Sequence, residues 1–193
     1  MSEEIMTDGT VGKSFAIIES NRINCSAPTD GFMRSFTALF RKHKNVYKLF
    51  FAMTKKLNKF FSISTAILVL YSTADDRLKV IAIRRPNYAR EGLTLTLPQK
   101  DSLLYDVFKN AMPHIEHFPA GFKGNFIEQK LLFDSHIKSL VICPIKYEGS
   151  ALGLVCFTSP TVYAFEMFEE GLADALIEQF GTIIDREKNK LNV

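Results

Sequence analysis

The sequence predicts an α+β domain, with helices at both ends of the chain and an antiparallel sheet between them. Two observations support this prediction. Apolar residues recur at helical spacing in residues 32–61 and again in residues 164–190. Between these stretches lie two pairs of β-rich runs, each pair separated by a short polar turn, as in β-hairpins. Strands joined by tight turns run antiparallel, so we expect helices segregated from the sheet rather than a doubly wound fold.

Length and composition indicate one globular domain. The chain has 193 residues, of which 47% are apolar and 23% are charged, as is typical of folded proteins. Residues 1–29 scatter Gly, Asn, Ser and Pro around one short apolar stretch, and we interpret them as an extension of a domain formed by residues 30–193. The longest apolar run, residues 66–71, is far shorter than the roughly 20 residues that a membrane-spanning helix needs.

The cysteines favour a reducing, cytoplasmic environment. Cys25, Cys143 and Cys156 are odd in number and too far apart in sequence to form close metal-ligand pairs. We therefore expect neither a disulfide framework nor a metal site.

The first helix is predicted to be long and to form a dimer. Asp30 can cap a helix through residues 32–61, in which the apolar positions alternate in steps of four and three. This spacing is typical of a coiled-coil seam and predicts a homodimer. The predicted interface residues are Phe36, Leu39, His43, Val46, Phe50, Met53 and Leu57.

Charge is segregated between the two end helices. Residues 32–61 contain many basic residues and no acid, whereas residues 164–190 carry acids such as Glu166, Glu178 and Glu187 beside their apolar stripe. We expect the two helices to lie side by side with complementary faces. A basic helix can also contact an anionic membrane or nucleic acid. Dimerisation is the preferred interpretation, and we do not expect nucleic acid binding.

The middle of the chain predicts shorter elements. The first hairpin comprises residues 63–71 and 78–83, residues 93–97 alternate as a half-buried strand, and residues 103–110 and 125–133 are helical. Residues 140–145 and 151–157 flank a turn at residues 148–150 and form the second hairpin. Pro144 lacks a backbone N–H, so we expect it at a sheet edge or bulge.

The second hairpin carries motifs that resemble one known family. Ser139, Cys143-Pro144-Ile145, Glu148-Gly149, Leu152-Gly153-Leu154 and Phe165 follow one another in an order similar to the closing strands and last helix of GAF domains. The resemblance covers residues 32–188. It implies a PAS-related antiparallel sheet with both end helices on one face and short helices and loops on the other. It also implies a small-molecule pocket beneath a cover formed by residues 86–138.

The resemblance does not identify a ligand or a cofactor. The signature of the cyclic-nucleotide-binding members cannot be placed on this sequence, and residues 86–138 contain no cysteine for a covalent bilin. Free methionine sulfoxide reductases share the fold, but they carry cysteines where this chain has residues 136–140. A redox enzyme is therefore the less favoured reading.

Several residues are candidates for ligand contact. Arg84, Arg85 and Tyr88 form a basic and aromatic cluster after a strand, suited to an anionic ligand, although a solvated strand end has the same pattern. His114 and His117 point in opposite directions if they lie on a strand, which favours ordinary histidines over metal ligands. Folding the second hairpin about residues 149–150 places Cys143 opposite Cys156, either as a redox pair or as two buried core residues. The remaining candidates are Tyr105, Phe122 and Phe126.

These features lead to three hypotheses of function. The first is a non-catalytic sensor domain that binds a small molecule and signals to a mate subunit or a separate partner protein. The second is a dimerisation or adaptor domain whose interior is filled by its own phenylalanines. The third is an enzyme, for which the sequence shows no recognisable arrangement of nucleophile, base and orienting group.

Overall fold

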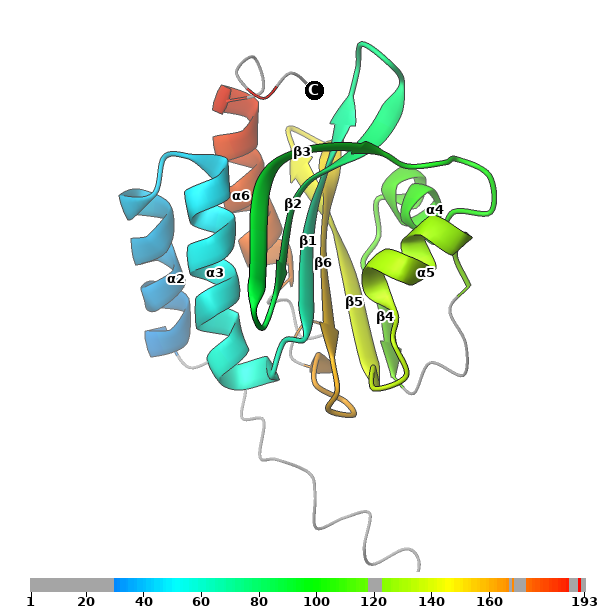
Figure 1. Cartoon of the computed structure of the whole chain (residues 1–193). Coiled ribbons are helices and arrows are strands. Elements are labelled where there is room, and N and C mark those ends of the chain that lie inside the picture. Colours follow the sequence, from blue (N-terminus) through cyan, green and yellow to red (C-terminus); the bar gives the residue numbers. More distant parts are fainter. Residues whose placement is uncertain (1–29, 118–122, 167, 169–172, 188–190, 192–193) are drawn as a thin grey trace, which may run out of the picture.

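The centre of the protein is a six-stranded antiparallel sheet (Figure 1). The computed structural model describes residues 30–117, 123–166, 168, 173–187 and 191, so the predicted extension, residues 1–29, lies outside the described part. The strands are β1 (Thr65–Ser72), β2 (Arg77–Arg85), β3 (Tyr88–Thr96), β4 (His114–His117), β5 (Ser139–Tyr147) and β6 (Ser150–Ser159). Their order across the sheet is β3-β2-β1-β6-β5-β4. Both predicted hairpins are confirmed, as β1-β2 and β5-β6.

Helices cover the two faces of the sheet unequally (Figure 1). The longer helices, α2 (Asp30–Lys42), α3 (Val46–Phe61) and α6 (Ala173–Glu187), pack on one face, and the short helices α4 (Leu103–Asn110) and α5 (Phe126–Leu132) pack on the other. The predicted α+β layering, with the end helices sharing a face, is therefore confirmed. None of the helices in the described part has the length and apolarity that crossing a membrane requires.

The first helix is broken, which corrects the prediction of one continuous helix through residues 32–61. Helix α2 ends at Lys42 and α3 begins at Val46. Asn45 has an extended backbone (φ −93°, ψ 131°), and its side-chain oxygen accepts a hydrogen bond from the Lys48 N–H at 3.0 Å. This N-cap gives a backbone N–H in the first turn of α3 its acceptor. It therefore starts a new helix where the apolar spacing alone predicted a continuous one.

The predicted dimer interface is wrong for most of its residues. Phe36, Val46, Phe50, Met53 and Leu57 belong to the protein's own core, each at most 2% exposed. Leu39 and His43 are half-buried. The apolar face of the sheet needs covering, and the stripe of α2 and α3 covers it, so little of the seam is available to a second chain.

Helices α3 and α6 lie side by side, as predicted (Figure 1). Helix α2 also meets α6, where the Phe40 ring of α2 and the Phe180 ring of α6 lie edge to face at 6.5 Å. The backbone N–H of Val46 donates to the Glu187 carboxylate at 2.7 Å, which places an acid at the positive end of α3. The acid–base contacts seen among the described residues do not include one between a lysine of α3 and α6, so the pairing of charged faces stays a prediction.

The register of the second hairpin separates its two cysteines. Glu148 and Gly149 have positive φ (49° and 79°) and form a two-residue turn, and a bulge lies before it, between Ile145 and Lys146. Cys143 therefore pairs with Val155, and Cys156 pairs with Ile142. Neighbouring positions along a strand face opposite ways, so the two thiols lie on opposite faces of the sheet. The expectation that they face each other is wrong.

Pro144 occupies the part of β5 that borders no strand on its outer side. Pairing between β4 and β5 runs from His117 opposite Ser139 to His114 opposite Ile142. Pro144 lies beyond that stretch and is paired only to β6. Its position at a sheet edge is confirmed.

One buried carboxylate joins the two short helices. Glu128 of α5 is fully buried and accepts hydrogen bonds from the Leu103 and Leu104 backbone N–H groups at 3.0 and 3.3 Å. It also accepts from the hydroxyl of Ser102, the N-cap of α4. A carboxylate suits this place because the first N–H groups of a helix lack intrahelical acceptors. Burial raises the pKa of Glu128, and the hydrogen bonds oppose that rise.

Gly181 of α6 allows the helix to approach β5 closely. A Cβ at this position would overlap the Lys146 carbonyl. Gly181→Ala should therefore lower the free energy of unfolding by about 1–3 kcal/mol, although Ala is the better helix former. Urea denaturation measures this loss. Glu178→Ala, at an exposed site on the same helix, should be nearly silent, and a stabilising Gly181→Ala would contradict the close packing.

Glu128→Ala should lower the free energy of unfolding by about 2–4 kcal/mol, because it leaves the buried N–H groups of Leu103 and Leu104 without their acceptor. Urea denaturation followed by circular dichroism measures the change. Gln129→Ala, at the exposed neighbouring position, is the matched control. Equal effects of the two substitutions would show that the carboxylate does not hold α4 and α5 together.

Glu128 should also make stability depend on pH. Its pKa in the folded protein lies above the ordinary value of 4.5, so over that interval the folded protein holds a proton that the unfolded chain has released. Wild-type stability should therefore fall as the pH rises from 4.5 through the folded pKa. Glu128→Gln cannot titrate and should not show this decline. A constant difference between the two proteins from acid to neutral pH would refute the assignment.

Candidate functional site

Side chains fill the space between the sheet and the short helices. Tyr105, one of the predicted ligand contacts, is 3% exposed and its hydroxyl accepts a hydrogen bond from the Leu78 N–H at 2.7 Å. The Tyr105 hydroxyl therefore satisfies a backbone N–H of strand β2, and the residue does not line an open pocket. The cluster that packs around it consists of Ile67, Val69, Leu78, Val80, Ile83, Leu97, Leu103, Leu104, Val107, Leu132, Leu140, Ile142, Leu154 and Cys156.

Other predicted contacts do not converge beneath the cover. Phe126 is 66% exposed, and the Lys130 ammonium lies 5.3 Å from its ring centre on the outside of α5. Cys143 faces the end helices on the opposite side of the sheet. The expectation that these two residues line a pocket under residues 86–138 is wrong. Phe122 lies outside the described residues.

The two histidines lie three positions apart on β4, so strand alternation places them on opposite faces. The His114 Nε2 atom lies 3.6 Å from a Glu116 carboxylate oxygen. The His117 ring lies 4.9 Å from the Tyr163 ring. Over the described residues, no group of three or more His, Cys, Asp and Glu side chains is placed to hold a metal ion.

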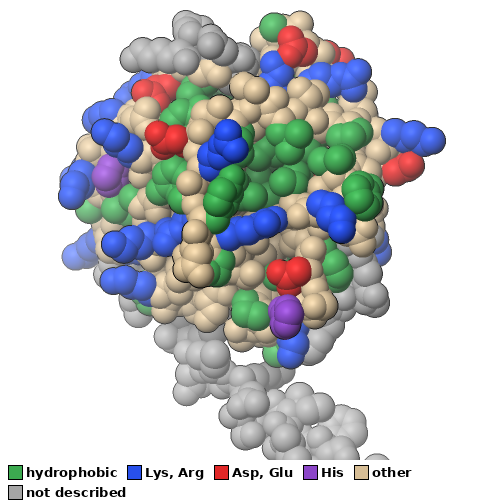
Figure 2. Space-filling model, in the orientation of Figure 1, with side chains coloured by type: hydrophobic (Ala, Val, Ile, Leu, Met, Phe, Trp, Pro, Cys, Tyr) green, Lys and Arg blue, Asp and Glu red, His purple; other side chains and the backbone are tan. Residues whose placement is uncertain are grey.

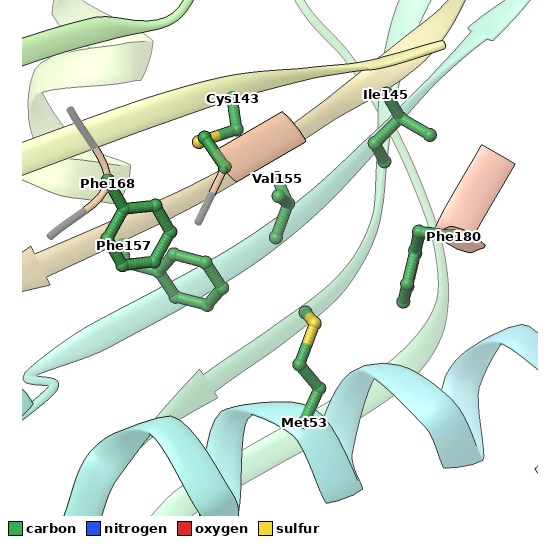
Figure 3. A pocket seen from close by; sticks show the side chains of 8 residues that line it. Met53, Cys143, Ile145, Val155, Phe157, Phe168 and Phe180 are labelled. Carbon is green, nitrogen blue, oxygen red and sulfur yellow. The ribbon is translucent and has the colours of Figure 1, made fainter. Parts of the chain in front are cut away.

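A small apolar cavity lies between the sheet and the end helices (Figure 3). Met53 of α3 points across it toward Val155 and Phe157 of β6, and Cys143 and Phe180 complete its wall. Its volume is about 10 Å³, room for about one water molecule. This cavity is a packing gap in the core and is too small for an organic ligand.

A ligand-sized groove lies elsewhere, between α3 and the tip of the β2-β3 hairpin. Its volume is about 490 Å³, within the range of small-molecule sites. One wall comes from α3 and the other from the hairpin. The lining residues are Phe51, Ala52, Lys55, Arg84, Arg85, Pro86, Asn87, Tyr88 and Ala89.

The groove brings together Arg84, Arg85 and Tyr88, and it adds Phe51 and Lys55 from a helix distant in sequence. Sequence reasoning missed the two α3 residues. Their only signal was that they lie beside the apolar stripe of a basic helix, and nothing in that pattern indicated which strand they would meet. Lys55 and Tyr88 are exposed, and Phe51 is half-buried, so the groove offers both positive charge and apolar surface.

The two arginines hold helices on opposite faces of the sheet. The half-buried Arg84 guanidinium donates to the Phe51 carbonyl of α3 at 3.2 Å. Arg85 donates to the Lys130 and Leu131 carbonyls at the end of α5, at 3.2 and 3.0 Å. Strand alternation explains the divergence. A guanidinium has five N–H donors, so Arg84 can serve the α3 carbonyl and an anion in the groove together.

The thiols are poorly suited to redox chemistry. Burial raises the pKa of Cys156 well above its ordinary value, and neighbouring Cys143 and Glu128 raise it further. The reactive form of cysteine is the thiolate. Cys156 is therefore held as a thiol in the core.

Solved structures with this architecture include both binding domains and enzymes. No protein-family model matches the sequence, and no curated protein matches it. The GAF domain of an Acinetobacter phosphoenolpyruvate-protein phosphotransferase superposes with a TM-score of 0.63 at 13% identity, covering 83% of this chain and 95% of that one. Free methionine-R-sulfoxide reductase from Neisseria meningitidis, in complex with its substrate, gives 0.62 at 12% identity, covering 82% and 89%.

A third similar structure holds a chromophore. It is the far-red-absorbing dark state of a protein with bound biliverdin IXa, with a TM-score of 0.58 at 14% identity, covering 81% of this chain and 98% of that one. Identities this low establish architecture and not activity. The six-stranded sheet, its strand pairing and the helices on its two faces show that this chain has the fold of GAF domains.

Proposed function

We propose that this protein is a non-catalytic regulatory domain that binds a small anionic ligand in the groove between α3 and the β2-β3 hairpin. The observation that carries the proposal is the meeting of Lys55, Arg84 and Tyr88 around a ligand-sized groove. Positive side chains recognise phosphate or carboxylate groups, and Tyr88 and Phe51 offer apolar surface to the rest of the molecule. The GAF fold, which recurs in regulatory proteins such as a two-component sensor histidine kinase, supports a sensory role.

The groove is coupled to both layers of helices through its hairpin. Arg84 bonds to α3, and Arg85, the next residue, bonds to the end of α5. An anion that draws either guanidinium into the groove would alter the contact between the sheet and a helix. The altered packing can then be read by a mate subunit or a separate partner protein. Homodimerisation stays a prediction, and it needs a surface other than the buried seam of α2 and α3.

A second candidate function is an adaptor domain without a small-molecule ligand. The packed cluster under α4 and α5 supports this alternative, because the space where a GAF-type pocket was expected is occupied by the protein's own side chains. An enzyme has less support. Cys143 and Cys156 are buried on opposite faces of the sheet, which disfavours a thiol reaction shared between them.

Thermal-shift measurements with AMP, citrate and inorganic phosphate test the groove. A ligand present at about ten times its Kd should stabilise the fold by about 1.4 kcal/mol, which corresponds to roughly 3–6 °C in Tm for a chain of this size. Lys55→Glu should abolish the shift by reversing the charge on the groove wall. Lys48→Glu carries the same change at an exposed position of the same helix outside the groove, and it should keep the shift.

The variants also separate the two candidate functions. If Lys55→Glu and Lys48→Glu lose the Tm shift equally, the shift reflects the overall charge of the protein and not binding in the groove. Absence of any shift in the wild-type protein with all three compounds would favour the adaptor.

A further inference from the structure

The outer surface of α2 and α3 is strongly basic. No Asp or Glu occurs between Asp30 and Asp75. Figure 2 shows Lys and Arg side chains gathered on the side of the molecule formed by these two helices. The exposed members of this basic face are Arg34, Arg41, Lys42, Lys44, Lys48, Lys55 and Lys59.

The positive charge of the basic face is not neutralised within the described part of the protein. The one lysine–carboxylate pair seen there joins Lys79 to Asp75, His114 and His136 lie near acids, and none of these contacts involves α2 or α3. Glu187 of the neighbouring helix contacts the Val46 backbone rather than a lysine. Burial and repulsion from Lys59 both lower the pKa of Lys56. An uncompensated face of this kind attracts anionic surfaces.

Two exposed aromatic rings stand at one end of the basic face. Phe60 is 58% exposed in the last turn of α3, beside Lys59, and Tyr88 is 48% exposed at the start of β3. The hairpin tip and the last turns of α3 lie next to each other at the lower end of the view in Figure 1. Lys55 and Tyr88 line the same groove, which confirms this proximity. Exposed rings are ordinary when they stand alone, but here they lie beside a dense set of basic side chains, and that combination is typical of interfacial membrane contact.

The placement of the rings favours a lipid surface over other anionic partners. Proteins that stack nucleic acid bases present aromatic rings on an open sheet face or along a groove. Here Phe60 stands on the end of a helix, outside the groove that Tyr88 lines, so the two rings do not form one stacking platform. Both can enter the boundary between headgroups and acyl chains. A second copy of this chain is disfavoured, since a symmetric contact would bring two basic faces together.

We propose that the basic face docks on an anionic phospholipid surface, with its Lys and Arg side chains among the headgroups and Phe60 and Tyr88 at the interface. The basic face shares Lys55 and Tyr88 with the groove, so the test uses Lys59 and Phe60, which do not line the groove and can be changed without touching the groove ligand. Lys and Arg near such a surface supply most of the attraction, which salt weakens, and the rings add a part that salt does not weaken.

Vesicle co-sedimentation of the full chain tests this docking. The protein should bind vesicles of phosphatidylcholine mixed with phosphatidylserine and should not bind phosphatidylcholine alone. Lys59→Glu should weaken binding at least about fivefold, the effect expected for one basic residue near the surface. Phe60→Ser should weaken it as well, and the residual binding should fall more steeply with salt than that of the wild type.

Matched controls lie on the opposite side of the sheet. Lys109→Glu makes the same charge change at an exposed site on α4, and Phe126→Ser removes a ring from α5 that is slightly more exposed than Phe60. Both should bind vesicles as the wild type does, and circular dichroism should show all four variants folded. Equal binding to both vesicle types, or equal losses in controls and test variants, would overturn the proposal. So would binding to a single-stranded oligonucleotide at protein concentrations that leave anionic vesicles unbound, which would assign the basic face to nucleic acid.

Discussion

The central strands β1, β6 and β5 are buried on both faces, and this double coverage constrains the rest of the protein. Side chains from successive positions enter different cores, one beneath the end helices and one beneath α4 and α5. A shift of one residue in register would exchange the two sets and leave neither packed. The tight turn at Glu148-Gly149 and the bulge after Ile145 hold the register of the β5-β6 pair. The same register places the two thiols in separate cores.

Because apolar side chains fill both cores, the groove with its basic side chains lies at the edge of the sheet. Strand β3 is exposed over most of its length, and its hairpin with β2 reaches the end of α3. The groove forms at this boundary, where the sheet is covered by only part of a helix. Arg84 and Arg85 tie the same boundary to helices on the two faces. A ligand at this edge would therefore touch the contacts that hold the layers together, without entering either core.

Two carboxylates, one buried and one half-buried, join elements of the fold. Glu128 accepts a hydrogen bond from the Leu103 N–H at the start of α4, and Glu187 accepts one from the Val46 N–H at the start of α3. Each acid meets the positive end of a helix distant in sequence, which stabilises it more than exposure near a lysine would. This use of Glu187 explains why α6 lies beside α3 while the lysines of α3 keep facing solvent. The basic residues that are concentrated in α2 and α3 thus form an exposed basic surface.

Local pattern determined most of the elements of this protein. Period-two and helical spacings, turn residues and caps act within a few residues, so the two hairpins, the short helices and the Glu148-Gly149 turn followed from the sequence, as did the GAF-like layering. The prediction of a half-buried strand over residues 93–97 was wrong, because β3 begins at Tyr88 and is exposed over most of its length. The break at Asn45 could have been predicted too, since Asn is a strong N-cap residue. Of the candidate site, the sequence indicated Arg84, Arg85 and Tyr88 but not the helix that faces them.

Only the tertiary structure decided what each apolar stripe would cover. From the sequence alone, the apolar stripe of α2 and α3 could pack against a partner helix or against a sheet. In the folded protein it packs on the sheet, whose apolar face it covers. Glu128 is a second example. Its position in the first turn of α5 could be read from the sequence, but its hydrogen bonds to the start of α4 could not. Contacts between distant segments depend on packing and register, and these arise only when the whole chain has folded.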